Sequence, residues 1–423
     1  MNRRIQDLWK SPTVRVVFGL AGGNLLGTAI GVVGSLIQAW YVSPADLGYF
    51  RGFSIATGYA FFFHLGILDA LQRFYPYYIG RGEKDHAVAI AQVCQVWMVA
   101  VSAIVSGVFV VLGIVSLSIG NWRAMLGWVV QATAMASFIY GGYLGATYRS
   151  GHDFTSIAKA SVLTSTVNLF TLPFFVFWPY VTLALRSSLG STISLIYLHL
   201  HRPLHLSWRF NWREWFDLLK SGFPLFVASY GANTFWSVIE TTLILRFLGT
   251  PSLGLWSMSF MVLEMANKVP QAITAVYIPR ITECYGRTGS VVDCLRLCKN
   301  PLLWGLLSMT ALAIGASLML PIIVPFIMPK YTEAVPVMCL MMLVLVFIIM
   351  ELPYYLLVAM GKILQQNIAV YIGLGCFVIF ALGALQFNMG LIGVVGASLL
   401  GRMIKILIIY IFIYNSRNMQ SVF

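Results

Sequence analysis

The chain has 423 residues, of which 59% are hydrophobic and only 10% are charged. Soluble domains carry about a quarter of their residues as charged side chains, so this composition excludes a soluble protein. The formal net charge is +13. Its distribution follows the membrane topology described below, so we expect no nucleic-acid partner and regard anionic membrane lipids as the partner of the basic side chains.

Twelve apolar runs follow one another along the chain, separated by charges, prolines or turn residues. A helix needs roughly 20 apolar residues to cross about 30 Å of hydrocarbon. The predicted spans are 15–41, 49–71, 87–117, 124–147, 157–177, 181–200, 222–248, 253–275, 301–327, 335–360, 366–387 and 391–414. Backbone polar groups in lipid must be satisfied within such a segment, and these runs do not alternate as barrel strands do. We therefore predict an all-α polytopic membrane protein with about twelve transmembrane helices.

Two short motifs occur once in each half of the chain. Asp-Leu-Trp-Lys-Ser at 7–11 returns as Asp-Leu-Leu-Lys-Ser at 217–221, and Leu-Gly-Tyr-Phe at 47–50 returns as Leu-Gly-Leu-Trp at 253–256. Six helices bring the chain back to the side on which it started, so two such halves are parallel repeats. We predict an N-terminal six-helix lobe at 1–200, a C-terminal lobe at 222–423, and a central cavity between them.

The segment 201–221 is predicted to be a cytoplasmic linker that contains an amphipathic helix over 205–220. Most of its charged residues fall away from one apolar helical face. That face consists of Trp208, Trp212, Trp215, Phe216 and Leu219. A helix of this kind is expected to lie on the membrane surface.

Lys and Arg are unevenly distributed over the connecting loops. With the N-terminus in the cytoplasm, the outer loops hold only Arg123 and Lys330, whereas the inner segments hold most of the others. Because positive loops stay on the cytoplasmic side, this asymmetry predicts that both termini are cytoplasmic.

A charged residue inside a predicted span is costly unless it faces a wet cavity or a partner, and ten of the charged residues there are candidates for function. The cations are Arg51, Arg186, Arg246, Lys268, Arg402 and Lys405, and the acids are Asp69, Glu240, Glu264 and Glu351. An excess of cations favours an anionic ligand, and arginine is well suited to phosphate because its planar fork makes paired bonds. We therefore predict these cations as cargo ligands.

Several of these residues have a simpler explanation. Arg51 and Arg246 lie near the outer ends of their helices, from which they can extend to lipid headgroups. Asp69 and Arg73 are four residues apart, as are Glu264 and Lys268 in a later span, so local ion pairs are the alternative there. Arg402 lies about 16 Å into its helix, close to the middle of the bilayer, which favours a cavity.

Metal and cofactor sites are not expected. The six cysteines have no metal-ligand pattern, and Cys294 with Cys298 supplies only two thiols one helical turn apart. His199, His201 and His205 cluster near the linker and are interpreted as a solvated basic face.

Four motifs in order resemble the Wzx-like polysaccharide (O-antigen) flippases of the MOP exporter superfamily, which includes the MATE transporters. They are Leu-Gly-Tyr-Phe at 47–50, Gly-Ile-Leu-Asp-Ala-Leu-Gln-Arg-Phe-Tyr-Pro at 66–76, Pro-Lys-Tyr-Thr-Glu-Ala-Val-Pro at 329–336 and Gly-Leu-Ile-Gly-Val-Val-Gly-Ala at 390–397. Asp69 and Arg73 belong to the second motif, in the loop region after helix two.

The resemblance implies that the protein moves an undecaprenyl-pyrophosphate-linked oligosaccharide from the inner to the outer leaflet of the bacterial cytoplasmic membrane. Alternating access would expose the cavity to each side in turn. The cargo would serve surface polysaccharide biosynthesis, with polysaccharide polymerase machinery as a further partner. Coupling to H⁺ or Na⁺ would use Glu240, Glu264 or Glu351, and the sequence does not select among them.

Two alternatives remain at this point. A multidrug or cation antiporter of the same superfamily would share the helices and the duplication, but cationic drugs call for an acidic cavity. A membrane polymerase or ligase for lipid-linked sugars would need a sizeable outer loop with catalytic groups, and no HExxH or GxSxG signature is present. We therefore expect a transporter and not an enzyme.

Overall fold

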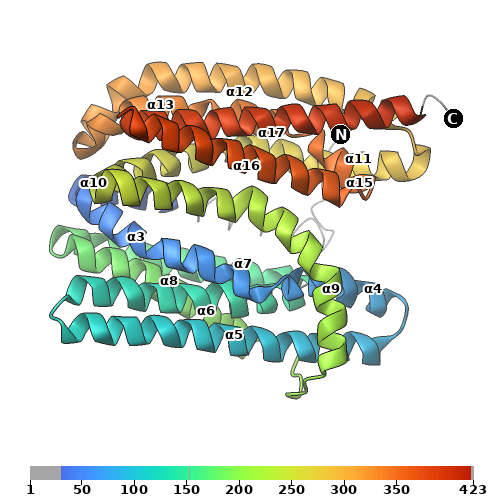
Figure 1. Cartoon of the computed structure of the whole chain (residues 1–423). Coiled ribbons are helices and arrows are strands. Elements are labelled where there is room, and N and C mark those ends of the chain that lie inside the picture. The colour runs from blue at the N-terminus through green and yellow to red at the C-terminus, as the bar shows by residue number, and fades with distance from the viewer. Residues whose placement is uncertain (1–29, 152, 421–423) are drawn as a thin grey trace, which may run out of the picture. The chain divides into compact units, whose positions relative to one another are not determined.

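The computed structural model describes residues 30–151 and 153–420, and within these ranges the chain is helical with no strand. The α-helices are Ile30–Tyr41, α3 (Pro44–Ala60), α4 (Ile67–Gly80), α5 (Lys84–Ser118), α6 (Trp122–Ser150), α7 (Phe154–Phe170), α8 (Pro179–Leu200), α9 (Trp212–Ser229), α10 (Trp236–Ala266), α11 (Lys268–Thr288), α12 (Val291–Ile327), α13 (Val335–Met342), α14 (Val344–Met350), α15 (Tyr354–Ala359), α16 (Ile363–Gln386) and α17 (Gly390–Gln420). The predicted all-α fold is confirmed (Figure 1).

Eight helices in the described part of the chain are long and apolar enough to cross a membrane, or nine if the bent pair Pro44–His64 and Ile67–Gly80 is one span. Fewer are found than the twelve predicted from apolar runs, partly because the predicted spans 222–248 and 253–275 share the helix α10. That helix is broken internally at Gly249, whose φ of 81° lies in the left-handed region that favours glycine. The first predicted span, 15–41, lies mostly outside the described residues, which include only its last turns.

The predicted linker helix starts later than expected. The chain has no helix from 202 to 211, and α9 begins at Trp212 and continues directly into the next membrane segment. Trp208 therefore lies outside the helix. The apolar face is also divided, because Trp215 is 8% exposed and packs 4.9 Å from the ring of Trp97, whereas Trp212 is 64% exposed. Packing against α5 holds Trp215, so this residue is a protein contact and not a membrane anchor.

The helices group into two compact units. The first comprises residues 30–42 and 56–226 of the described chain, and the second comprises 43–55 and 227–420. One border falls inside α3, and the other falls inside α9, just before the π-helical turn η3 (Tyr230–Phe235). The division into lobes at 1–200 and 222–423 stays a prediction.

The first unit is built on α4, α5, α6 and α8, which pack side by side (Figure 1). Its core contains Met98 of α5, Met135 of α6 and Trp215 of α9. The bend before α4 lies at Leu65 and Gly66, both with positive φ. A Cβ on Gly66 would lie 2.6 Å from the carbonyl oxygen of Gly222, so the close approach of α9 requires glycine there.

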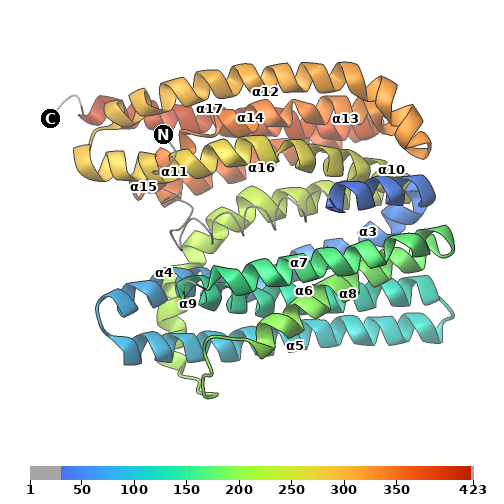
Figure 2. The same ribbon diagram turned by 180° about the vertical axis from the view of Figure 1, so that it is seen from behind.

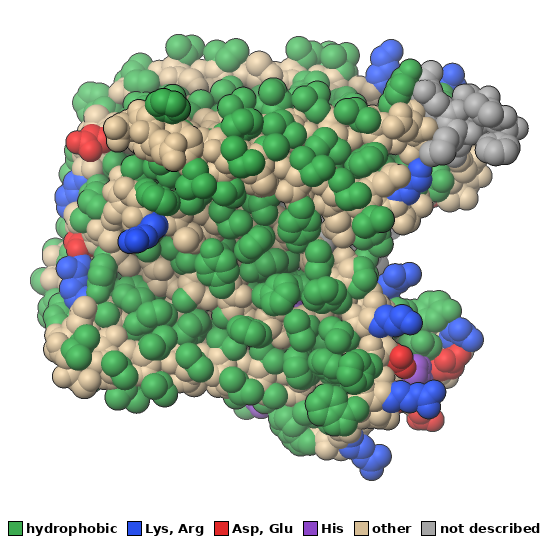
Figure 3. Space-filling view, in the orientation of Figure 1, with side chains coloured by type: hydrophobic (Ala, Val, Ile, Leu, Met, Phe, Trp, Pro, Cys, Tyr) green, Lys and Arg blue, Asp and Glu red, His purple; other side chains and the backbone are tan. Residues whose placement is uncertain are grey.

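The second unit is built on α10, α12, α13, α16 and α17, and Figure 2 shows α12 and α16 running along its length. Trp236 lies at its centre, 1% exposed, with its ring stacked 5.4 Å from that of Phe377. In Figure 3, hydrophobic side chains cover much of the visible helix surfaces, and many of the visible charged side chains lie towards helix ends. This distribution fits helices that face lipid along their length.

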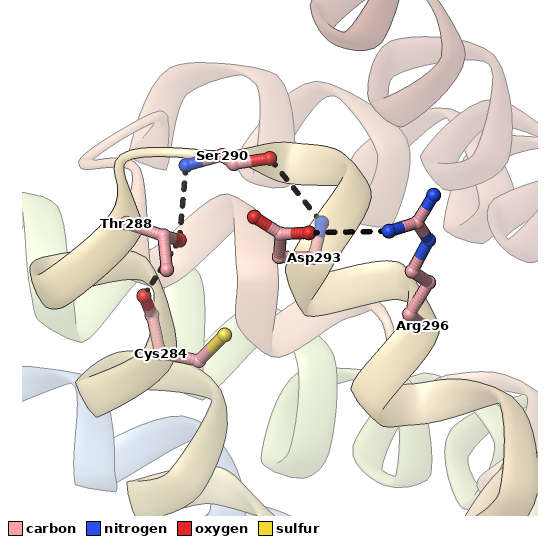
Figure 4. A network of polar contacts seen from close by, with 5 residues as sticks. All are labelled: Cys284, Thr288, Ser290, Asp293 and Arg296. Carbon is pink, nitrogen blue, oxygen red and sulfur yellow. Dashed lines mark hydrogen bonds and ion pairs between the residues drawn. The ribbon is translucent and has the colours of Figure 1, made fainter.

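A polar turn joins α11 to α12 and fixes where α12 begins (Figure 4). The hydroxyl of Thr288 donates to the carbonyl of Cys284, and the backbone N–H of Ser290 donates to Thr288. Ser290 then caps α12 by accepting from the N–H of Asp293, whose carboxylate lies 3.7 Å from Arg296. Cys294 and Cys298 of α12 are buried within an apolar cluster of the second unit.

Candidate functional site

A cavity of about 390 Å³ opens within the second unit. It is lined by α10, α11, the segment from α14 to α15, and α17. Its charged lining residues are Glu240, Glu264, Glu351, Arg402 and Lys405. Five of the residues that the sequence singled out from four separate spans are therefore brought to one cavity by the packing of helices in a single unit.

Lys405 of α17 is paired with Glu351, the residue that follows α14. The Nζ atom of Lys405 lies 2.5 Å from a carboxylate oxygen of Glu351, and the lysine side chain is only 3% exposed. A buried ammonium group needs such a partner because removing it from water is costly. The pair neutralises both charges at the inner wall of the cavity.

Glu240 of α10 is held by neutral donors. The indole N–H of Trp256 donates to one carboxylate oxygen at 3.2 Å, and the hydroxyl of Ser398 donates to the other at 3.4 Å. Trp236 donates in turn to the oxygen of Ser398 at 3.0 Å. This chain of bonds fixes the Glu240 side chain in place, since every donor in it belongs to a buried residue.

Arg402 of α17 lies above an aromatic face. Its guanidinium carbon is 4.9 Å from the centre of the Trp236 ring, a cation–π contact that is strongest where water is excluded. The Nε atom of Arg402 is buried and has no hydrogen-bond partner among the described residues. Arg402 is also close enough to Glu240 for their charges to attract. It thus retains a hydrogen-bond donor for a ligand.

Glu264 of α10 has the least support of the three carboxylates. Within the described chain it accepts one side-chain hydrogen bond, from the amide of Asn267 at 3.3 Å, and makes no ion pair. Lys268, four residues further on, is exposed and does not line the cavity. The local ion pair considered for these two residues is therefore not formed.

The rest of the cavity lining is neutral and was not found from the sequence. It includes Ser237, Gln271, Thr274, Tyr354 and Tyr355. Tyr354 accepts a hydrogen bond from the amide of Gln366 on α16. Residues of these types occur throughout apolar spans, so only the tertiary structure distinguishes those that face the cavity.

Other predicted ligands lie away from this cavity. Arg51 and Arg246 are exposed residues of the second unit, and neither lines it. Arg186 belongs to the first unit, where a Cβ on Gly34 would lie 2.3 Å from its guanidinium. One terminal nitrogen of Arg186 is buried without a partner in the described ranges.

The motif residues Asp69 and Arg73 are also apart from the cavity, in the first unit. They form no ion pair in the described structure, contrary to the simple interpretation of their spacing. Arg73 instead lies 5.5 Å from the ring centre of Phe74.

The composition of the cavity differs from the expected excess of cations. Three carboxyl groups line it, against one guanidinium and one ammonium group. Cations outnumber acids in the predicted spans as a whole, but four of the cations do not line this cavity, namely Arg51, Arg186, Arg246 and Lys268. A metal site is not indicated, because no group of three or more potential ligands occurs within the described residues.

No family model and no curated protein matches this sequence. Solved structures do match its fold. A multidrug resistance MATE family transporter of the MOP superfamily, in an inward-facing conformation, has a TM-score of 0.75 at 13% identity over 93% of this chain and 95% of that one. The lipid II flippase MurJ, in an inward closed conformation, has a TM-score of 0.71 at 14% identity over 93% and 87%.

A third match is a MOP superfamily transporter from Pyrococcus furiosus, described as having a binding pocket of reverse polarity that suggests a different function. Its TM-score is 0.63 at 14% identity over 99% of this chain and 98% of that one. At such identities the likeness establishes the fold alone. The chain has the fold of MOP superfamily transporters, and its substrate has to be argued from its own residues.

Proposed function

We propose that this protein is a flippase that moves an undecaprenyl-pyrophosphate-linked oligosaccharide from the inner to the outer leaflet of the bacterial cytoplasmic membrane by alternating access. The observation that carries the proposal is Arg402, an arginine in a membrane helix with a buried, unpaired Nε atom at a cavity wall. A guanidinium group binds phosphate oxygens through charge-assisted bonds. Support comes from the fold, which is shared with a lipid II flippase.

Within this proposal, the pyrophosphate head binds Arg402 and Lys405, while the polyprenyl tail remains in lipid. Arg51, Arg186, Arg246 and Lys268 would then contact the cargo or headgroups at other stages of the passage, and Asp69 and Arg73 would act at the entrance. The delivered glycan would be consumed by polysaccharide polymerase machinery that builds O-antigen, capsule or exopolysaccharide. Both termini are proposed to be cytoplasmic.

A multidrug or cation antiporter is the second candidate, and one observation favours it. Three carboxyl groups line the cavity of the second unit, and Glu264 has no ion-pair partner there among the described residues. An unpaired carboxylate in a low-dielectric site attracts cations. The same carboxylates are the groups through which H⁺ or Na⁺ would be coupled.

The two candidates are separated by reconstitution of the purified protein into vesicles. One set contains a fluorescent undecaprenyl-pyrophosphate oligosaccharide, and its exposure on each leaflet is followed with an impermeant quencher. A second set is loaded with a cationic dye, and efflux is followed under imposed H⁺ or Na⁺ gradients. Vesicles with the Arg402→Ala variant and with a neutral lipid of the same chain length serve as controls.

Flipping of the pyrophosphate lipid that is reduced by Arg402→Ala supports the proposal. Gradient-driven dye efflux without flipping of the lipid rejects it and supports the antiporter. Equal movement of the charged and neutral lipids means that the pyrophosphate is not recognised, which rejects the assigned role of Arg402.

A further inference from the structure

Each of the two cations of the cavity has a carboxylate of the same cavity as a neighbour. Lys405 is 2.5 Å from Glu351, and Arg402 lies within reach of the charge on Glu240. With all five groups ionised, the cavity holds three negative and two positive charges, which leaves a net charge of −1. The net charge of such a cavity opposes anion binding, and neutralising one carboxylate brings it to zero.

Glu240 and Glu351 differ in the contacts that each would keep if an anion attracted its cationic neighbour. Glu240 keeps its hydrogen bonds to Trp256 and Ser398 even if Arg402 turns to a ligand. Glu351 makes no hydrogen bond to a neutral side-chain donor in the described structure, so Lys405 is its main support. If an anion binds the ammonium group of Lys405 in place of Glu351, the carboxylate of Glu351 is left unpaired within a predicted membrane span.

An unpaired carboxylate in such a place takes up a proton, because the neutral acid is far less costly to bury. We propose that the cavity of the second unit binds an anionic headgroup together with a proton, which Glu351 accepts when Lys405 moves from Glu351 to the anion. The inference rests on the proposed function. It adds the residue that accepts the proton and states that anion binding and proton uptake favour each other.

The groups that face Glu351 from the surrounding helices are consistent with this exchange. The charged residues of the lining other than Glu351 come from two helices. They are Arg402 and Lys405 of α17 and Glu240 and Glu264 of α10. The lining residues from α11 are neutral, namely Gln271 and Thr274. Tyr354 and Tyr355, close to Glu351 in the chain, also line the cavity. Arg402 repels Lys405, so a dianionic head that touches both relieves this repulsion as well.

Thermodynamic linkage between anion binding and proton uptake makes the affinity for the anion depend on pH. If anion binding takes up a proton, then anion affinity increases as the pH decreases wherever Glu351 is ionised in the free cavity. The expected size is about tenfold in affinity per pH unit for one proton.

The test uses the full-length protein in detergent and isothermal titration calorimetry. The probe is a water-soluble pyrophosphate diester with one short prenyl chain and one sugar, which has no group that titrates near neutral pH. Measuring the binding enthalpy in buffers of different ionisation enthalpy gives the number of protons taken up. We expect about one proton per bound anion for the parent.

Glu351→Gln and Glu264→Gln are the matched variants, because both remove a carboxyl group from the same cavity. Glu351→Gln should bind the diester at pH 8 at least about tenfold more tightly than the parent and without proton uptake, since Lys405 is then free. Glu264→Gln should retain the uptake. If Glu351→Gln does not fold, the pH dependence of the parent's affinity decides by itself.

Binding by the parent without proton uptake, or with proton release, overturns the inference, as does uptake that persists in Glu351→Gln. Absence of diester binding overturns it too. Flipping of the lipid-linked oligosaccharide is measured separately in vesicles, so the proposed function can stand when the proton coupling fails. An inorganic phosphate arm shows whether a free anion is recognised in the same way as the headgroup.

Discussion

Gly48 and Gly254, which occupy equivalent positions in the two copies of the duplicated Leu-Gly motif, lie in one helix contact. A Cβ on Gly48 would lie 1.7 Å from the carbonyl oxygen of Thr250 and 2.7 Å from the N atom of Gly254. A Cβ on Gly254 would lie 1.8 Å from the carbonyl oxygen of Pro44. Each copy thus supplies the small residue that lets the other helix approach, as in close helix packing within membranes.

Gly48→Ala should therefore destabilise the second unit, because the new methyl group meets backbone atoms that cannot move aside. Overpacking of this kind costs about 1–3 kcal/mol or more. Thermal unfolding in detergent measures the loss. Gly315→Ala in α12 is the control, since nothing lies within 4 Å of a Cβ there. Equal unfolding temperatures for the two variants would contradict the contact.

Arg402→Ala should reduce flipping of the pyrophosphate lipid by about 10- to 100-fold, because it removes a charge-assisted donor worth about 1.5–3 kcal/mol. Arg402→Lys should restore only part of the activity, since the planar fork is lost. Initial flipping rates at matched protein levels give the comparison. Arg296→Ala is the control, because Arg296 is exposed, pairs with Asp293 and does not line the cavity. Full activity in Arg402→Ala would show that Arg402 does not bind the pyrophosphate of the cargo.

Lys405→Met should destabilise the protein by at most about 3–5 kcal/mol, because it leaves the carboxylate of Glu351, whose side chain is only 23% exposed, without its partner. The double variant Lys405→Met/Glu351→Gln should recover most of that loss, since neither charge remains. Unfolding of the four proteins in a double-mutant cycle gives the coupling. Simple additivity of the two single changes would show that the pair does not stabilise the fold.

Trp215→Ala should destabilise the first unit by about 3–5 kcal/mol, because Trp215 fills the core beside Trp97. Trp212→Ala should leave stability nearly unchanged, since Trp212 is 64% exposed. The comparison is made by thermal unfolding and by protease cleavage near Arg209. If the two variants unfold alike, the interface of α9 with α5 is not as the structure shows it.

The proposed topology is checked with single cysteines at exposed positions. A cysteine at Lys330 should react with an impermeant thiol reagent from outside intact cells, whereas cysteines at Lys84 and Arg209 should react only in inverted vesicles. The parent, with its own cysteines, sets the background. Reaction of the Arg209 position from outside would contradict the assignment of both termini to the cytoplasm.

Much of the fold can be predicted from the sequence because a membrane permits few backbone structures. Apolar runs in lipid must be helical, so the all-α class could be predicted from composition and run length. The equivalence of 47–50 and 253–256 was also visible as a repeated motif. The predicted boundary between 221 and 222 falls inside α9, because this helix runs from Trp212 to Ser229 without a stop signal at Ser221.

A charge in an apolar run is visible without a structure, so the residues that are costly in a membrane can be identified from the amino-acid order. The packing of the helices shows in addition that five of these residues share one cavity and that Lys405 is paired with Glu351. The cost of burial belongs to a single residue, whereas charge neutralisation depends on distances between helices far apart in the chain.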